Sequence, residues 1–233
     1  MDRYVGKFLY GSQNYGLSTP ESDHDYKWVE MPSFEHLFYA QSTLNRQTDE
    51  HNSVWDYRDF AKNLLKANPN ALELLFSTEV EYFDPEFEEL CEFVRENVGA
   101  LVRMKWKEFT SAVHGVAWNS VKRNGVNPKT VSRLVYFYLL WCSLTAEDEG
   151  LEQLNGEMTY ETWRADFGWP RLLRNLDPEA PATKKEFDEV LSYLSHTWQT
   201  SNWWVVPQEG DKEKYEEVER RLKVYFANYL TNH

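Results

Sequence analysis

The most constraining feature of this chain is a turn-rich stretch that carries two aspartates one residue apart. A short apolar run ends in Gly11-Ser12, ten residues of loop follow, and Asp23 and Asp25 then flank a histidine. If residues 26–29 continue as a β-strand, the two-residue period places both aspartates on one face. Two carboxylates on one face repel each other unless a cation lies between them, and hard oxygen ligands suit Mg²⁺. The spacing therefore predicts a site for Mg²⁺, with Mn²⁺ as the alternative, held by Asp23 and Asp25.

The Gly11-Ser12 pair supplies what the binding of a triphosphate needs. Glycine lets the backbone approach a phosphate closely, and Ser12 offers a hydroxyl and an N–H as donors. The alternative interpretation is an ordinary hairpin or loop, because Gly, Ser, Asp, Asn and Pro all favour turns. We expect Gly11 and Ser12 to bind the phosphates of a nucleotide.

Two strings of residues resemble known proteins. Gly-Ser followed by Asp-x-Asp resembles the nucleotidyltransferase superfamily that includes DNA polymerase β. The longer string Gly-Ser-x-x-Tyr-Gly-Leu-x-Thr-Pro-x-Ser-Asp-x-Asp at residues 11–25 is similar to a bacterial and phage family of predicted nucleotidyltransferases. The string Leu-Leu-Lys-Ala-Asn-Pro-x-x-Leu-Glu-Leu-Leu-Phe at residues 64–76 resembles the same family. The resemblance covers residues 5–77 well and residues 100–145 loosely.

The resemblance implies an enzyme that transfers a nucleoside monophosphate from an NTP to a hydroxyl and releases pyrophosphate. Asp23 and Asp25 would hold the metal ion against the triphosphate, where its charge does much of the catalytic work. The first alternative is a catalytically impaired module of the same fold that binds a nucleotide or a protein partner. The second is a structural helical protein in which the Gly-Ser segment is incidental.

The resembled superfamily usually has a third carboxylate on a neighbouring strand, and the resemblance implies that it would complete the metal site and act as base toward the acceptor hydroxyl. Counting back from Pro69 by the spacing of the resembled family leads to His51, with Asp49 and Glu50 immediately before it. Glu50 or Asp49 could fill the role, or His51 could act as a general base or metal ligand. Each of the three could equally be a solvated loop or strand residue.

Four further charged residues are candidates for supporting the site. Lys66 could meet a phosphate, although an exposed lysine at a helix end is the commoner case. Lys129 and Arg133 lie one helical turn apart and could neutralise a β- or γ-phosphate, or be ordinary surface cations. Glu73 stands among leucines, and a buried carboxylate needs a partner. It is therefore either a structural ion pair or cap, or a residue that supports the site.

The resemblance implies an α/β (α+β) protein with a small mixed sheet, and periodicity and turn signals predict that a mainly helical half follows it. We expect a nucleotidyltransferase core at residues 1–99 and a helical domain at residues 100–233. Asp56 and Ser33 are expected as helix caps, and Asp84-Pro85 as a helix start. The expected strands span residues 3–10, 23–30 and 79–82, where residues 3–10 could also be the end of a helix that leads into a strand. The expected helices span residues 33–39, 57–65, 85–94, 101–124, 129–144, 159–167, 183–197 and 211–229, and residues 145–182 are otherwise rich in loops.

Composition limits the partners. The chain has 25 basic and 38 acidic residues, a net charge of −13, so it is poorly steered toward bulk nucleic acid. This argues against a processive polymerase and leaves a small molecule, a protein or a locally contacted RNA end as acceptor. Cys91 and Cys142 are expected to be reduced thiols, without the spacing of a zinc site. We expect no signal peptide and no membrane span, and a cytoplasmic location.

Overall fold

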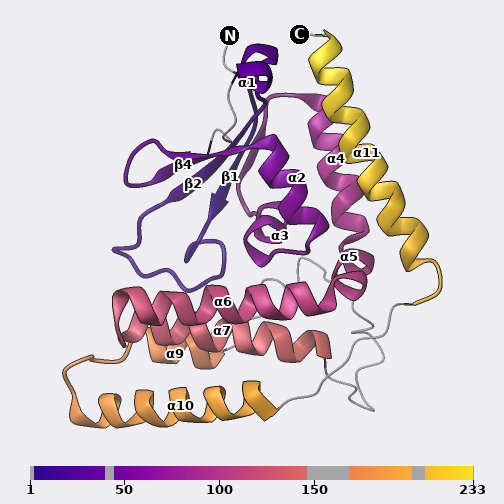
Figure 1. Ribbon diagram of the computed structural model, residues 1–233. Helices are drawn as coiled ribbons and strands as arrows, with labels where there is room; N and C mark the ends of the chain where they lie inside the picture. The colour runs from indigo at the N-terminus through magenta and orange to yellow at the C-terminus, as the bar shows by residue number, and fades with distance from the viewer. Residues whose placement is uncertain (1–2, 40–44, 146–167, 201–207, 233) are drawn as a thin grey trace. The chain divides into compact units, whose positions relative to one another are not determined.

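The computed structural model describes residues 3–39, 45–145, 168–200 and 208–232, and Figure 1 shows its helices and strands. The chain divides into two compact units, Met1–Lys105 with Val206–His233, and Trp106–Val205. The expected division after residue 99 had placed the whole C-terminal half together. The structure instead groups the last helix with the first unit.

The first unit contains a mixed sheet of five strands within the described residues, in the order β3-β4-β2-β1-β5. β1 pairs antiparallel with β2 and β5, β2 pairs parallel with β4, and β3 pairs antiparallel with β4. This small mixed sheet and the helices that follow it confirm the predicted α+β class. The strands are β1 (Tyr4–Tyr10), β2 (Asp25–Glu30), β3 (Arg46–Gln47), β4 (Asn52–Asp56) and β5 (Val80–Tyr82).

The helices of the first unit begin where the sequence supplies caps. Asp56, Asn68 and Asp84 each accept a hydrogen bond from the backbone N–H two residues on. The predicted caps Asp56 and Ser33 are confirmed, and Asn68-Pro69, expected only to end a helix, also starts one. The helices are α1 (Phe34–Tyr39), α2 (Tyr57–Leu65), α3 (Pro69–Leu75), α4 (Pro85–Glu96), α5 (Val98–Met104) and α11 (Asp211–Asn232).

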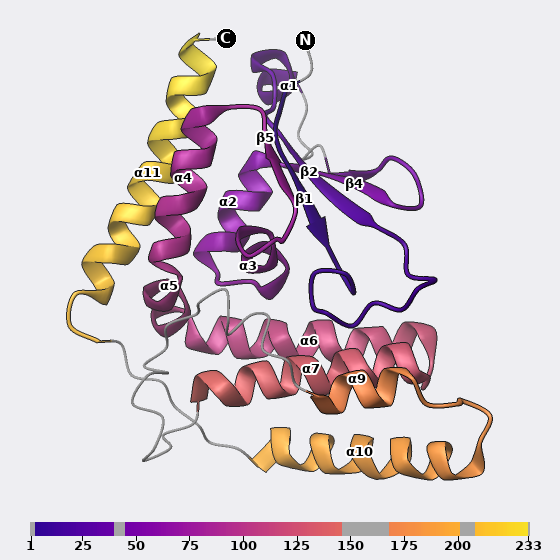
Figure 2. The ribbon, with the colours of Figure 1, turned by 180° about the vertical axis from the view of Figure 1, so that it is seen from behind.

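An aromatic core joins the sheet to these helices. The Phe8 ring of β1 lies 6.4 Å from the Phe60 ring of α2 and 6.3 Å from the Phe87 ring of α4. All three side chains are fully buried. Figures 1 and 2 show α2, α3 and α4 along one side of the sheet. The face of β1 that carries Phe8 is therefore the face that these helices cover.

The C-terminal helix α11 packs on α5, α4 and α2. The Tyr57 hydroxyl of α2 donates to the Leu222 carbonyl of α11 at 2.9 Å. Arg103 of α5 and Asp211 of α11 form a bidentate ion pair, with both N···O distances 2.7 Å and both side chains buried. These contacts between residues more than a hundred positions apart explain why α11 belongs to the first unit.

The second unit is helical in its described residues, with α6 (Trp106–Asn124), α7 (Pro128–Thr145), α9 (Gly168–Arg174) and α10 (Pro181–Thr200). The predicted antiparallel pair at residues 101–144 is present as α6 and α7, and the Trp141 indole donates to Thr110 at 3.2 Å. No helix among the described residues is long and apolar enough to cross a membrane.

Two predicted boundaries are wrong. The helix expected at residues 101–124 is broken at Lys105, whose backbone leaves the helical region (φ −119°, ψ 32°), so that α5 ends before α6 begins. No Gly or Pro marks this break in the sequence. The loop-rich segment 145–182 contains α9, whose Pro170 and Leu173 are buried. The helix expected at residues 159–167 lies outside the described residues.

Candidate functional site

The candidate site begins where β1 ends, at Gly11. Tyr10 pairs with Asp25 across β1 and β2, so the end of one strand lies beside the start of the other. Gly11 has φ +82°, a conformation that L side chains rarely adopt. A Cβ at this position would lie 3.4 Å from the Asp25 Oδ2. The structure therefore brings together two of the predicted site residues, Gly11 and Asp25.

Residues 11–17, here called the Gly-Ser turn, follow. The Tyr15 N–H donates to the Gly11 carbonyl at 3.2 Å, and the Leu17 N–H donates to the Ser12 carbonyl at 2.9 Å. Within the described part of the chain, neither the Ser12 N–H nor its hydroxyl has a hydrogen-bond partner. These two donors are therefore available to an oxygen-rich ligand.

Glu73 of α3 forms hydrogen bonds with this turn. Its side chain is only 2% exposed, and its carboxylate accepts hydrogen bonds from the Gly11 N–H and the Tyr15 hydroxyl. The Asn14 amide donates to the Glu73 carbonyl at 3.3 Å. These contacts give Glu73 the partners that a buried carboxylate needs, and they link it to the Gly-Ser turn. They also join the two strings of residues that carry the family resemblance.

The parallel pairing of β2 with β4 brings His51 next to Asp25. Tyr26 pairs with Asn52, and the Tyr26 N–H donates to the His51 carbonyl at 2.8 Å. The preceding residues of the two strands are therefore neighbours, and the His51 Nδ1 lies 3.5 Å from the Asp25 Oδ1. Of the three candidates for the third place in the site, His51 is the one in contact with Asp25.

Asp49 and Glu50 are arranged differently. The Asp49 Oδ1 accepts from the backbone N–H groups of His51 at 2.8 Å and Asn52 at 2.7 Å. The His51 N–H and the Asn52 side-chain amide lower the pKa of the Asp49 carboxyl. Asp49 thus closes the turn before β4. Glu50 is exposed and makes no hydrogen bond or ion pair to any described residue.

A comparison with protein families matches a stretch of the chain that includes this site. The model of the family described as "RNA repair pathway DNA polymerase beta family" (RlaP) matches residues 7–148, which is more than half of the chain. The chain belongs to this family. The predicted polymerase β-like nucleotidyltransferase resemblance is thereby confirmed. A search of curated proteins and a search of solved structures each find no match.

Nucleotidyltransferases related to the RlaP family generally use divalent metal ions. In this chain, the carboxylates predicted to bind such an ion are those of Asp23 and Asp25. Asp25 is partly exposed and Asp23 is exposed in the loop just before β2. Among the described residues, no group of three or more His, Cys, Asp or Glu side chains is arranged to hold a metal ion. Mg²⁺ commonly binds through one or two carboxylates together with substrate phosphates. Asp25 beside the Gly-Ser turn, with Asp23 two residues earlier in the chain, supplies the carboxylates that this mode needs.

The predicted basic residues lie on different elements. Lys66 is exposed at the C-terminal cap of α2. Lys129 is exposed in the first turn of α7, and the Arg133 guanidinium lies 5.6 Å from the centre of the Phe137 ring. Lys129 and Arg133 belong to the second compact unit, whereas the turn and Asp25 belong to the first. Their role toward a phosphate stays a prediction.

One cation near the site was missed by sequence reasoning. Lys27 follows Asp25 by two residues on β2, so both side chains leave the same face of the strand. The Lys27 Nζ lies 4.7 Å from the centre of the Tyr10 ring and 4.1 Å from the centre of the Trp55 ring. The same two-residue period that selected Asp23 and Asp25 could have found it.

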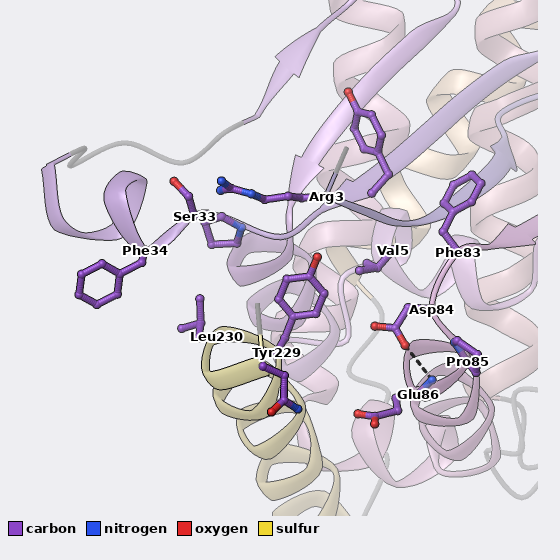
Figure 3. Close-up of a pocket in the computed structure, with 13 residues that line it drawn as sticks. Arg3, Val5, Ser33, Phe34, Phe83, Asp84, Pro85, Glu86, Tyr229 and Leu230 are labelled. Carbon is purple, nitrogen blue, oxygen red and sulfur yellow. Dashed lines mark hydrogen bonds between the residues drawn. The ribbon is translucent and has the colours of Figure 1, made fainter. Parts of the chain in front are cut away.

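A cavity of about 660 Å³ lies elsewhere in the first unit (Figure 3). Its lining includes Arg3 from just before β1, Asp84 and Phe83 from before α4, and Tyr229 of α11. The Asp84 carboxylate there already accepts hydrogen bonds from the Glu86 N–H and the Tyr225 hydroxyl. The cavity adjoins the N-terminal end of β1, whereas the Gly-Ser turn follows the C-terminal end of that strand.

Proposed function

We propose that this chain is a metal-dependent nucleotidyltransferase that transfers a nucleoside monophosphate from an NTP to a hydroxyl. The observation that carries the proposal is the Asp25 carboxylate beside both Gly11 and His51. Family membership supports the reaction class. The acidic net charge argues for a small or locally contacted acceptor.

In the proposed reaction, the acceptor oxygen attacks the α-phosphorus and the bond to the bridging oxygen of the β-phosphate breaks. Pyrophosphate leaves, and the hydroxyl proton passes to a base. A divalent cation held by Asp23 and Asp25 would neutralise the charge of the triphosphate. Ser12 donates its N–H and hydroxyl to phosphate oxygens, and His51 takes the third place in the site as general base.

We propose an RNA end as the acceptor, because the family is described by an RNA repair pathway. The net charge of −13 is compatible with contacts to one terminus and opposes the binding of long nucleic acid. Transfer to a small molecule or to a protein hydroxyl is the competing outcome, which would contradict an RNA end as acceptor.

The test uses the purified chain with each α-labelled NTP, Mg²⁺ or Mn²⁺, and a short RNA ending in a 3′-hydroxyl. A matched RNA ending in a 3′-phosphate lacks the attacking hydroxyl and serves as the control. We expect label on the first RNA, pyrophosphate release, and loss of both in the Asp25→Asn and Asp23→Asn variants, which should stay folded. An Asp25→Asn variant as active as the wild type would refute the assignment.

A second function is favoured by one observation, the histidine in place of a third carboxylate beside Asp25. A chain of this kind would bind a nucleotide or a protein partner without turning the nucleotide over. Binding of NTP at equilibrium, with no pyrophosphate released toward any acceptor in a cell lysate, would select this function over catalysis.

A further inference from the structure

A buried carboxylate that accepts hydrogen bonds from a turn of the candidate site needs an explanation. Burial of an ionised carboxylate costs several kcal/mol unless donors surround it. Glu73 stands between Leu72 and Leu74, both fully buried, and the donors that reach its carboxylate include the Gly11 N–H and the Tyr15 hydroxyl. Both belong to the Gly-Ser turn.

The Asn14 side chain adds two hydrogen bonds between the Gly-Ser turn and the segment from Glu73 to Thr78. Asn14 is fully buried, its amide donates to the Glu73 carbonyl at 3.3 Å, and its oxygen accepts from the Thr78 N–H at 3.1 Å. Residues 11, 14 and 15 are therefore held by the end of α3 and the residues that follow it. Glu73 and Thr78 therefore add hydrogen bonds from outside the turn to those within it.

The direction of these bonds has a consequence for ligand binding. Because Glu73 accepts the Gly11 N–H, that donor points into the protein and does not face a ligand. The next donors along the turn are the Ser12 N–H and hydroxyl, which have no partner in the described part of the chain. The Ser12 N–H belongs to the same planar peptide group as the Gly11 carbonyl, which accepts the Tyr15 N–H at 3.2 Å. This hydrogen bond and the one from the Gly11 N–H to Glu73 hold the peptide groups on both sides of the Gly11 α-carbon, and with them the direction of the Ser12 N–H.

We propose that Glu73 and Tyr15 are positioning residues that orient the Ser12 donors toward the phosphates of an NTP. The inference rests on the proposed function, and it assigns the second string of residues, at 64–76, a role in nucleotide affinity. Preorganised donors bind an anion more tightly because they need not be ordered on binding.

The test compares two tyrosines that differ in place but not in chemistry. Tyr15→Phe removes the hydroxyl that donates to Glu73, and the matched control Tyr57→Phe removes a buried hydroxyl that donates to the Leu222 carbonyl. The probes are ATP, GTP, CTP and UTP with Mg²⁺, measured by calorimetry, and urea unfolding reports the stability of each variant. We expect about a tenfold rise in the dissociation constant for Tyr15→Phe and none for Tyr57→Phe, at similar losses of stability.

A second pair of variants keeps the inference testable if Tyr15→Phe does not fold. Glu73→Asp shortens the side chain, so that one carboxylate can no longer reach both donors, and should weaken binding by a similar factor. Glu73→Gln can accept the Gly11 N–H with its amide oxygen and donate its amide N–H to the Tyr15 oxygen, which reverses that second hydrogen bond, and it should recover most of that affinity. Equal nucleotide affinity in Tyr15→Phe and Tyr57→Phe, or in Glu73→Asp and the wild type, overturns the inference alone. A wild-type chain that binds none of the four nucleotides overturns the proposed function and the inference together.

Discussion

Gly11 and Gly210 form a matched pair for testing how close the Gly-Ser turn lies to the chemistry. Gly11 has φ +82° and Gly210 has φ +84°. A Cβ at Gly11 would lie 3.4 Å from the Asp25 Oδ2, whereas a Cβ at Gly210 would meet nothing within 4 Å. Alanine therefore imposes similar backbone strain at both places, and only at Gly11 does its methyl group contact a site residue.

The expected magnitudes follow from these geometries. An L residue held at positive φ costs about 1–2 kcal/mol, so each variant should lose about that much free energy of unfolding. In Gly11→Ala the added methyl also occupies the space between the turn and Asp25. A phosphate or cation approaching Asp25 from that side would be displaced, and misplacement by about 1 Å can cost about 10²-fold in rate.

The assay measures urea unfolding and label transfer from NTP for both variants. We expect equal losses of stability, with label transfer reduced by about two orders of magnitude in Gly11→Ala alone. Label transfer that falls equally in both variants would mean that strain, not proximity to Asp25, is responsible. Wild-type transfer in Gly11→Ala would remove the turn from the site altogether.

Three further predictions concern His51, the metal ion and the buried ion pair. His51→Ala should lower pyrophosphate release about 10²-fold and His51→Asp should recover part of it, and an unaffected His51→Ala would contradict a role as base. Chelation of divalent cations should stop label transfer and added Mg²⁺ or Mn²⁺ should restore it, whereas transfer in the presence of chelator would exclude the metal. Arg103→Met should cost about 3–5 kcal/mol in urea unfolding, because it leaves Asp211 buried and unpaired, and a loss below about 1 kcal/mol would contradict this. Burial opposes ionisation of Asp211, but the Arg103 guanidinium and the Gln208 N–H lower the pKa of its carboxyl. The contribution of Asp211 to the free energy of unfolding is therefore complete above the unfolded pKa of about 3.9 and is lost as pH falls through the lower folded pKa. This pH dependence should be absent in Arg103→Met.

Local rules predicted the parts of this fold that depend on neighbouring residues. The short apolar run before Gly11 indicated β1, the residues that follow Asp25 indicated β2, and short polar residues before apolar runs located the caps at Ser33, Asp56 and Asp84. The family strings identified Gly11 and Asp25, which the structure brings together. These features need only a window of a few residues to be recognised.

The remaining features depend on contacts between distant parts of the chain. The segment before β4 is polar and carries no strand pattern, so the choice among Asp49, Glu50 and His51 as the neighbour of Asp25 emerges only from the parallel pairing of β2 with β4. The break at Lys105 separates a helix that packs on α11 from one that packs on α7, and no local signal distinguishes them. The partners of Glu73 lie about sixty residues away, so the sequence indicated that a partner was needed without naming it.

The return of α11 to the first unit bears on how the protein is assembled during synthesis. The rings of Tyr57 and Phe87 lie 5.4 Å and 5.7 Å from the ring of Tyr225, close to the far end of the chain. A nascent chain therefore leaves these aromatic side chains uncovered while all of the second unit is still being translated. A truncated product ending at Lys105 should be prone to aggregation, and coexpression of residues 208–233 as a separate peptide should rescue its solubility.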